Sequence, residues 1–197
     1  MKGTSRSIVF RILVTGIFSF AFILGAVIIF GLASLIGIVF GIASLPFSLR
    51  VSLAVFLLIG FAFVDLISIK NKRYCHIGLR RQTPKTLIHR YKITTVAAIW
   101  GLDTGLAITT FRVAAITWGA LLMTGLELSS WWIGFGYGVG FTLPLSIQFL
   151  LFNPNSKFRK SLSSRLEELI AKRSFIQFGS ATILFLAALV LSLKLLN

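Results

Sequence analysis

Acidic residues are scarce in this sequence, and charge of either sign is low. Only 5 of the 197 residues are Asp or Glu, and Asp, Glu, Lys and Arg together make up 13%. A soluble domain of ordinary composition carries about 25% charged residues. With 56% hydrophobic residues, this chain cannot cover its surface in water, which excludes a soluble globular protein and a disordered one. The mean hydropathy of +0.93 predicts an all-α, polytopic integral membrane helix bundle.

Cysteine and histidine are almost absent. The single Cys75 excludes an intramolecular disulfide, and the two histidines, His76 and His89, both lie in one basic segment. A metal centre, a haem site and a catalytic triad therefore lack an evident set of residues. The sequence predicts no catalytic residue, no metal site and no cofactor, and so a protein that is not an enzyme.

Lys and Arg outnumber Asp and Glu by 20 to 5. In a soluble protein this balance would indicate a nucleic-acid partner, but basic residues of membrane proteins gather in cytoplasmic loops. Segments 70–92 and 153–174 are rich in Lys and Arg. We therefore expect no nucleic acid, a position in the plasma membrane of a prokaryote, and both segments in the cytoplasm. An even number of crossings then separates the two segments. The single span predicted after residue 174 puts the C-terminus outside.

Long apolar segments set the expected number of crossings, since a helix crosses the hydrocarbon core in about 20 residues. Residues 8–45 would form a straight helix of roughly 57 Å, against a core of about 30 Å. We predict a tight turn near residues 25–30. Residues 93–126 are also too long for one straight crossing and are predicted to form a broken helix. The six predicted spans are 8–25, 29–45, 49–69, 93–126, 131–152 and 175–196.

The two halves of the chain share one plan, an overlong apolar segment followed by a polar connection and a cleaner span. With six crossings, the halves would be two inverted three-helix units with broken helices, an arrangement found in transporters. The alternative is five crossings, in which residues 8–45 cross once with a re-entrant part and the N-terminus lies inside.

A glycine-rich succession in the second half resembles a known family. Residues 101–111 (GLDTGLAITTF) precede WGALL at 118–122 and FGYGVGFTLPL at 135–145. This is similar to the second half of the membrane domain of the CcdA/DsbD thiol-electron transporters, in which a broken helix with a Pro-Cys motif precedes a glycine-rich span that ends in proline. At the Pro-Cys position this chain has Thr109 and Thr110. Thiol exchange needs a partner sulfur, so the resemblance implies a shared scaffold without the redox activity.

Asp103 is the strongest candidate for a functional side chain. It lies about ten residues into the predicted broken span, roughly 15 Å deep, where a carboxylate costs about 2.5–3.5 kcal/mol and must be paired, hydrated or protonated. The alternative is a polar contact that only fixes helix packing. A direct pair with Arg112 would require the break, because nine residues of continuous helix put the two on opposite faces. We predict an ion-, proton- or substrate-binding site of Asp103, Thr104, Thr109, Thr110 and Arg112.

A second acidic residue, Asp65, lies near the end of the predicted span 49–69, a few positions before Lys70 and Lys72. We expect its side chain to reach the cytoplasmic interface, where water and the two lysines solvate it. This interpretation gives Asp65 no functional role.

Glycines alternate along the predicted span 131–152. Gly134 with Gly138, and Gly136 with Gly140, form two overlapping Gly-x-x-x-Gly pairs, which permit close approach of a second helix. Pro144 is expected to kink the same span. We assign these five residues to helix packing.

Residues 157–173 carry apolar side chains at helical spacing among many basic ones. A basic amphipathic helix beside a span typically lies on an anionic inner leaflet; a docking face for a soluble partner is the alternative. The basic residues predicted to face the lipid surface are Lys157, Arg159, Lys160, Arg165, Lys172 and Arg173.

Together these features predict a small transporter-like protein or permease component with a site near Asp103. The alternative is a non-catalytic membrane subunit, such as an accessory or immunity protein. In that case the glycine-rich faces and the basic helix would assemble with other membrane proteins.

Overall fold

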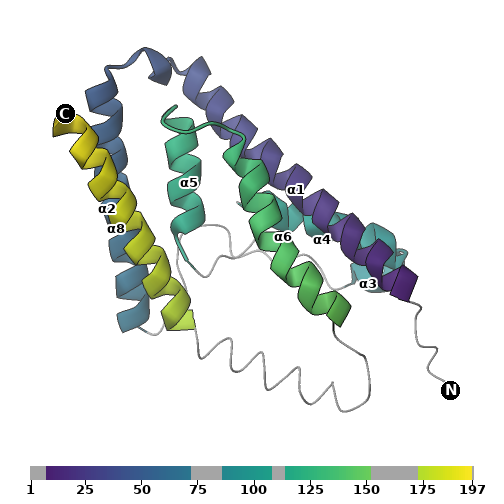
Figure 1. Cartoon of the computed structure of the whole chain (residues 1–197). Coiled ribbons are helices and arrows are strands. Elements are labelled where there is room, and N and C mark those ends of the chain that lie inside the picture. Colours follow the sequence, from purple (N-terminus) through teal and green to yellow (C-terminus); the bar gives the residue numbers. More distant parts are fainter. Residues whose placement is uncertain (1–7, 72–85, 108–113, 152–172, 197) are drawn as a thin grey trace, which may run out of the picture.

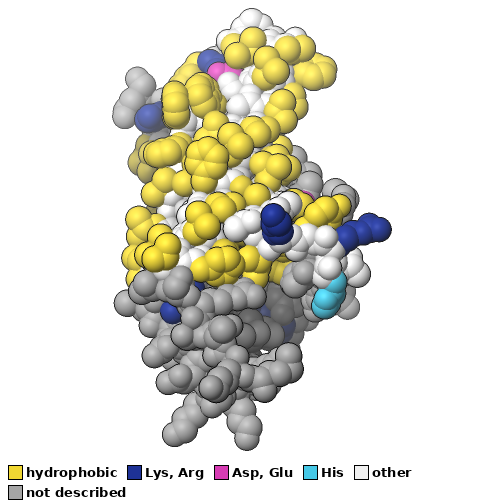
Figure 2. Space-filling model, turned by 90° about the vertical axis from the view of Figure 1, so that its right-hand side faces the viewer, with side chains coloured by type: hydrophobic (Ala, Val, Ile, Leu, Met, Phe, Trp, Pro, Cys, Tyr) yellow, Lys and Arg dark blue, Asp and Glu magenta, His cyan; other side chains and the backbone are white. Residues whose placement is uncertain are grey.

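The surface of the long helices is apolar. A computed structural model describes residues 8–71, 86–107, 114–151 and 173–196, and every regular element within these ranges is helical. Large side chains such as Phe20, Phe56 and Phe175 are 71%, 73% and 79% exposed, and hydrophobic side chains cover most of the described face in Figure 2. Such a surface suits lipid and not water. The predicted fold class, an all-α membrane helix bundle, is confirmed.

Three described helices are long and apolar enough to cross a membrane: α1 (Ile8–Val39), α2 (Phe47–Lys70) and α8 (Arg173–Leu196). Two shorter apolar helices, α5 (Ile116–Gly125) and α6 (Ile133–Leu151), lie between them in sequence. The remaining described α-helices are α3 (Leu87–Arg90) and α4 (Ile93–Gly105). In Figure 1, α2 ends and α8 begins at the lower end of the bundle, which we call the basic end because segments 70–92 and 153–174 adjoin it.

The tight turn predicted near residues 25–30 is wrong. α1 is one continuous helix through Gly25 and Gly31. A tight turn at glycine would break backbone hydrogen bonds of the helix. Because lipid offers no replacement partners, the helix continues through the glycines. A helix of 32 residues is about 48 Å long, and Figure 1 shows it inclined across the bundle relative to α2 and α8. Such an inclination shortens its projection across the membrane.

The chain turns instead after α1, where two residues favour a turn. Gly41 has a left-handed backbone (φ 66°), the 3-10 helix η1 (Ile42–Ser44) follows, and Pro46 precedes α2. Glycine adopts positive φ without strain, and proline suits the start of a helix. Among the described residues of the first half, the long helices are α1 and α2, which does not fit the expected three-helix half. Residues 8–39 form one helix, as in the five-crossing alternative, and no re-entrant part is present within them.

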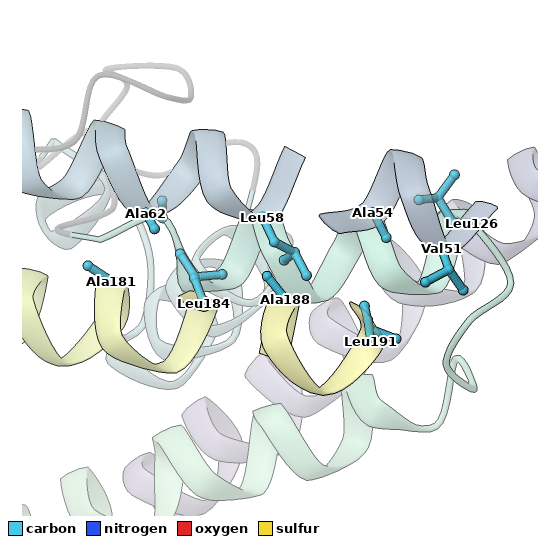
Figure 3. Packing of buried hydrophobic residues seen from close by; sticks show 10 residues of the cluster. Val51, Ala54, Leu58, Ala62, Leu126, Ala181, Leu184, Ala188 and Leu191 are labelled. Carbon is cyan, nitrogen blue, oxygen red and sulfur yellow. The ribbon is translucent and has the colours of Figure 1, made fainter. Parts of the chain in front are cut away.

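α2 and α8 pack side by side in antiparallel directions, as Figure 3 shows. Buried side chains recur every three or four residues on each helix, so each presents one stripe to the other. Alanines alternate with larger residues along both stripes, which lets the helices approach closely. The side chains in this seam are Val51, Ala54, Leu58 and Ala62 of α2 and Ala181, Leu184, Ala188 and Leu191 of α8.

α1 and α4 form a second close pair, and they run parallel. Gly101 lies against the backbone of Phe18, and Gly105, one turn later, lies against the backbone of Phe22. From the other side, a Cβ on Gly25 would lie 2.6 Å from the carbonyl oxygen of Leu102. The three glycines thus permit contact between the two backbones.

α6 packs on another face of α1 through half of its glycines. A Cβ on Gly134 would lie 2.8 Å from the Ala26 carbonyl oxygen, and one on Gly138 would lie 2.9 Å from the Ile23 Cα. A Cβ on Gly136 or Gly140 would meet no described atom within 4 Å. One Gly-x-x-x-Gly pair therefore faces α1, and the other faces outward.

The described residues of the segment 93–126 form two helices, as expected for a broken span. α4 ends at Gly105, and α5 begins at Ile116 and lies between the α2–α8 pair and α1. A Cβ on Gly119 of α5 would meet Leu58 and Leu184 of the seam, while Leu121 belongs to a buried cluster with residues of α1. α5 thus connects the two helix groups.

Candidate functional site

α5 is too short to reach both membrane surfaces. Its 10 residues span about 15 Å, roughly half of the hydrocarbon core. The first N–H groups and the last C=O groups of any helix have no partner within the helix. Because lipid offers none, the ends of α5 need partners from the protein itself.

At the N-terminal end of α5, the partner is a carboxylate from α2. The backbone N–H of Ala115 donates to both Oδ1 and Oδ2 of Asp65, each at 3.0 Å. The Ser180 hydroxyl of α8 donates to Asp65 Oδ2 at 2.6 Å and accepts from the Ile116 N–H at 3.1 Å. Asp65 is 0% exposed. We call Asp65, Ala115, Ile116 and Ser180 the Asp65 cluster.

The expectation that Asp65 reaches the interface is wrong. Asp65 continues the buried stripe of α2, three residues after Ala62 and seven after Leu58, so its side chain faces α8 and α5. A negative charge there interacts favourably with the positive N-terminal end of the α5 dipole. The hydrogen bonds from Ala115 and Ser180, together with this dipole, offset part of the loss of water around the carboxylate.

At the C-terminal end of α5, the partner is a cation from the same helix α2. Arg50 Nη1 donates to the carbonyl oxygens of Leu126 at 3.3 Å and Glu127 at 3.2 Å. Glu127 has a positive φ of 55°, and its Oε1 accepts a hydrogen bond of 2.7 Å from the Ser34 hydroxyl of α1. These four residues form the Arg50 cluster, in which a positive charge meets the negative end of the α5 dipole.

The sequence-predicted site lies at the other side of the break, on α4. Asp103 and Thr104 occupy the last turn of α4, and both are half-buried. Thr109, Thr110 and Arg112 lie outside the described residues. The described residues bring together no three His, Cys, Asp or Glu side chains that would hold a metal ion.

Two tryptophans of the broken span carry buried N–H donors that no described residue accepts from. The indole nitrogens Nε1 of Trp100 on α4 and Trp118 on α5 are buried without a hydrogen-bond partner among the described residues. A buried donor without a partner is unfavourable by about 1–3 kcal/mol. α4 and α5 thus each carry an indole N–H that could donate to a bound polar group.

The remaining predicted residues are placed as follows. Pro144 lies inside α6, whose helix continues on both sides of it. Arg173 is the first residue of α8. The other basic residues assigned to the lipid surface (Lys157, Arg159, Lys160, Arg165 and Lys172) and the predicted helix 157–172 lie outside the described residues, as do Cys75 and His76.

Comparisons of the chain with protein-family models, curated proteins and solved structures find no match. The resemblance of the second half to thiol-electron transporters stays a prediction. Functional interpretation therefore rests on the broken span and on the charged side chains that hold α5.

Proposed function

We propose that this chain is a small transporter-like protein or permease component whose working element is the break between α4 and α5. The observation that carries the proposal is the placement of two charged side chains, Asp65 and Arg50, inside the bundle at the ends of one short helix. Ionisable groups at membrane depth mark ion, proton and substrate pathways. Discontinuous helices are the usual place for such sites in transporters.

The two carboxylates have different roles in this proposal. Asp65 accepts hydrogen bonds from the Ala115 N–H and the Ser180 hydroxyl. Its role is therefore to position the N-terminal end of α5. Asp103, beside Thr104 on the last turn of α4, is the ion-binding group. A carboxylate with neighbouring hydroxyls suits a cation or a proton.

The orientation follows from the positive-inside rule. We propose that the basic end faces the cytoplasm of the cell and that α8 runs outward from it. With α1 as one crossing, the start of α1 lies at the cytoplasmic side as well. This agrees with Arg11 near the start of α1.

Cation flux into liposomes tests the proposal. The purified chain is reconstituted with pyranine inside, and a potassium gradient with valinomycin drives proton entry; a parallel assay follows radioactive Na⁺. We expect protein-dependent flux of one of these cations. Asp103→Asn should reduce the rate at least about tenfold at equal incorporation, because the amide carries no charge to balance the cation.

Thr182→Ala is the matched control, since Thr182 is exposed and its hydroxyl donates to the Phe178 carbonyl oxygen of the same helix at 3.0 Å. This variant should keep the wild-type rate. Flux no faster than in protein-free liposomes for both cations, or an unchanged rate in Asp103→Asn, would contradict the proposal.

A non-catalytic membrane subunit is the second candidate, favoured by the outward glycines of α6. Gly136 and Gly140 leave an open strip on which another transmembrane helix can lie. If this is the function, a membrane protein should co-purify in mild detergent in fixed proportion. Gly136→Leu with Gly140→Leu should release it, and Gly60→Leu, at an equally open position on α2, should not. Isolation of the chain alone counts against this candidate.

A further inference from the structure

An apolar groove follows the seam between α1 and α4. Its volume is about 580 Å³, and every side chain that lines it is apolar. Gly16 opens the groove on α1, because a Cβ built there would meet no described atom within 4 Å. The main walls are Leu13, Phe20 and Leu24 of α1 and Ala98 and Leu102 of α4.

The length of the groove matches one leaflet. Along α1 it extends from Leu13 to Leu24, which is roughly 16 Å of helix. The hydrocarbon core is about 30 Å thick, so one leaflet occupies about half of it. The groove therefore has the reach of a single acyl chain and not of a spanning helix.

Basic side chains gather at one end of the groove. Because α1 and α4 run parallel, Arg11, two residues before Leu13, and Lys92, directly before α4, lie at the same end. Arg90 and Lys92 are exposed. Figure 2 shows Lys, Arg and His side chains bordering the hydrophobic surface on this side of the molecule.

An interfacial aromatic residue marks the same level. Tyr91 lies between Arg90 and Lys92 and is 49% exposed. Exposed tyrosines of membrane proteins collect at the headgroup level. The three acidic residues that the structure describes lie elsewhere. Asp65 and Glu127 belong to the clusters that hold α5, and Asp103 follows Lys92 by about 16 Å of helix.

We propose that the α1–α4 groove binds one anionic phospholipid, with an acyl chain in the groove and the phosphate on Arg90 and Lys92. The apolar lining suits the chain. Basic pockets between transmembrane helices on the cytoplasmic side recognise acidic headgroups. The proposal is independent of transport through the α4–α5 break, and either can fail alone.

Native mass spectrometry of the full chain tests this site. The protein in mild detergent is offered equal amounts of palmitoyl-oleoyl phosphatidylglycerol and phosphatidylcholine. We expect one phosphatidylglycerol to be retained in preference. Arg90→Gln with Lys92→Gln should weaken its binding roughly thirtyfold, since each basic group near an anionic lipid contributes about 1 kcal/mol.

Gly16→Leu tests the groove itself by filling it, and it should reduce retention of the same lipid at least about fivefold. Gly60→Leu, open and exposed on α2, and Lys70→Gln with Lys194→Gln are matched controls that should bind as the wild type does. Circular dichroism and a single chromatographic peak establish that each variant is folded. If Gly16→Leu does not fold, the double variant Arg90→Gln with Lys92→Gln decides the test. Equal retention of the two lipids would overturn the proposal. So would a dimer that Gly16→Leu dissociates, because a second copy would then occupy the groove.

Discussion

Asp65 and Arg50 lie on one helix and hold opposite ends of another. Asp65 accepts from the N–H of Ala115, directly before α5, and Arg50 donates to the carbonyl oxygens of Leu126 and Glu127, directly after α5. Their separation along α2 is about 22 Å, and the α5 segment between the bonded groups measures about 18 Å. Since α2 and α5 run in opposite directions, each charge meets the end of the dipole that it stabilises.

This arrangement explains how a helix of 10 residues persists where water cannot complete its hydrogen bonds. Ser180 of α8 and Ser34 of α1 add hydroxyl groups at the two ends. Each of the three long described helices, α1, α2 and α8, thus contributes a polar side chain at an end of α5. The position of α5 is consequently coupled to the packing of the whole bundle.

Asp65→Asn should weaken the bundle. The amide keeps one acceptor oxygen where the carboxylate uses two, so one hydrogen bond of the Asp65 cluster is lost and the charge on the α5 dipole disappears. We expect a loss of about 1–3 kcal/mol in the free energy of unfolding. Thermal unfolding in detergent, followed by circular dichroism, should show a midpoint lower by roughly 2–4 °C for each kcal/mol.

Ser180→Ala should cost about 1–2 kcal/mol of unfolding free energy for the same reason, because the Ile116 N–H loses its acceptor and Asp65 loses a donor. In a double-mutant cycle with Asp65→Asn, the sum of the two single losses of unfolding free energy should exceed the loss in the double variant by at least about 0.5 kcal/mol. Thr182→Ala on the same helix is the control and should change the midpoint little. Strict additivity would show that Ser180 and Asp65 do not act as one cluster.

Arg50→Gln should destabilise the opposite end of α5. The glutamine amide is too short to reach the carbonyl oxygens of Leu126 and Glu127 from the same backbone position and carries no charge. We expect a loss of about 1–3 kcal/mol, typical of hydrogen bonds that involve a charged group. Lys70→Gln, exposed at the last residue of α2, should lose less than about 0.5 kcal/mol. Equal midpoints for the two variants would refute the role given to Arg50.

Composition was sufficient to predict the helical membrane bundle, because an apolar chain in lipid has few alternatives. The break between α4 and α5 was also predictable from the excess length of residues 93–126. Asp65 was not. In α2 nearly every face is apolar, so hydrophobic periodicity does not distinguish the face that meets protein from the face that meets lipid. The available signal was the recurrence of small and polar residues at Ala54, Ala62 and Asp65, which share the buried stripe.

The turn predicted near residues 25–30 is absent for a related physical reason. Excess length in residues 8–45 suggests a turn at a glycine, but a long helix in lipid also fits the membrane by tilting. Gly25 instead provides space for the Leu102 carbonyl of α4. Sequence alone does not show whether a transmembrane glycine bends its own helix or admits a neighbour. That depends on which helix lies opposite, and α4 is separated from Gly25 by more than one complete helix in sequence.

Cys75 permits a direct test of orientation, because it is the single cysteine and belongs to basic segment 70–92. With the basic end in the cytoplasm, a membrane-impermeant maleimide should label Cys75 in inverted membrane vesicles and leave it unlabelled in intact cells. Cys75→Ser supplies the background. A cysteine placed at residue 197 in the Cys75→Ser chain should give the opposite pattern. Labelling of Cys75 from outside intact cells would invert the proposed orientation.

The glycines of α1 provide a matched pair for the backbone contact between α1 and α4. A Cβ on Gly25 would lie 2.6 Å from the Leu102 carbonyl oxygen and 3.1 Å from the backbone of Gly105, whereas one on Gly31 would meet no described atom within 4 Å. Gly25→Ala should therefore force α4 away from α1 and cost about 1–3 kcal/mol. Gly31→Ala should be neutral or stabilising by up to about 1 kcal/mol, because alanine favours the helix.

Thermal midpoints of the two alanine variants, measured in the same detergent, separate the two explanations of glycine in α1. If glycine matters only for helix flexibility, both substitutions act alike and stabilise the helix. If Gly25 is the contact with α4, only Gly25→Ala lowers the midpoint, and Gly101→Ala, which faces the Phe18 backbone from α4, lowers it as well. Gly25 and Gly101 both lie at the α1–α4 contact. The double alanine variant should therefore lose less unfolding free energy than the sum of the two single variants, because helices already separated by the first Cβ accommodate the second.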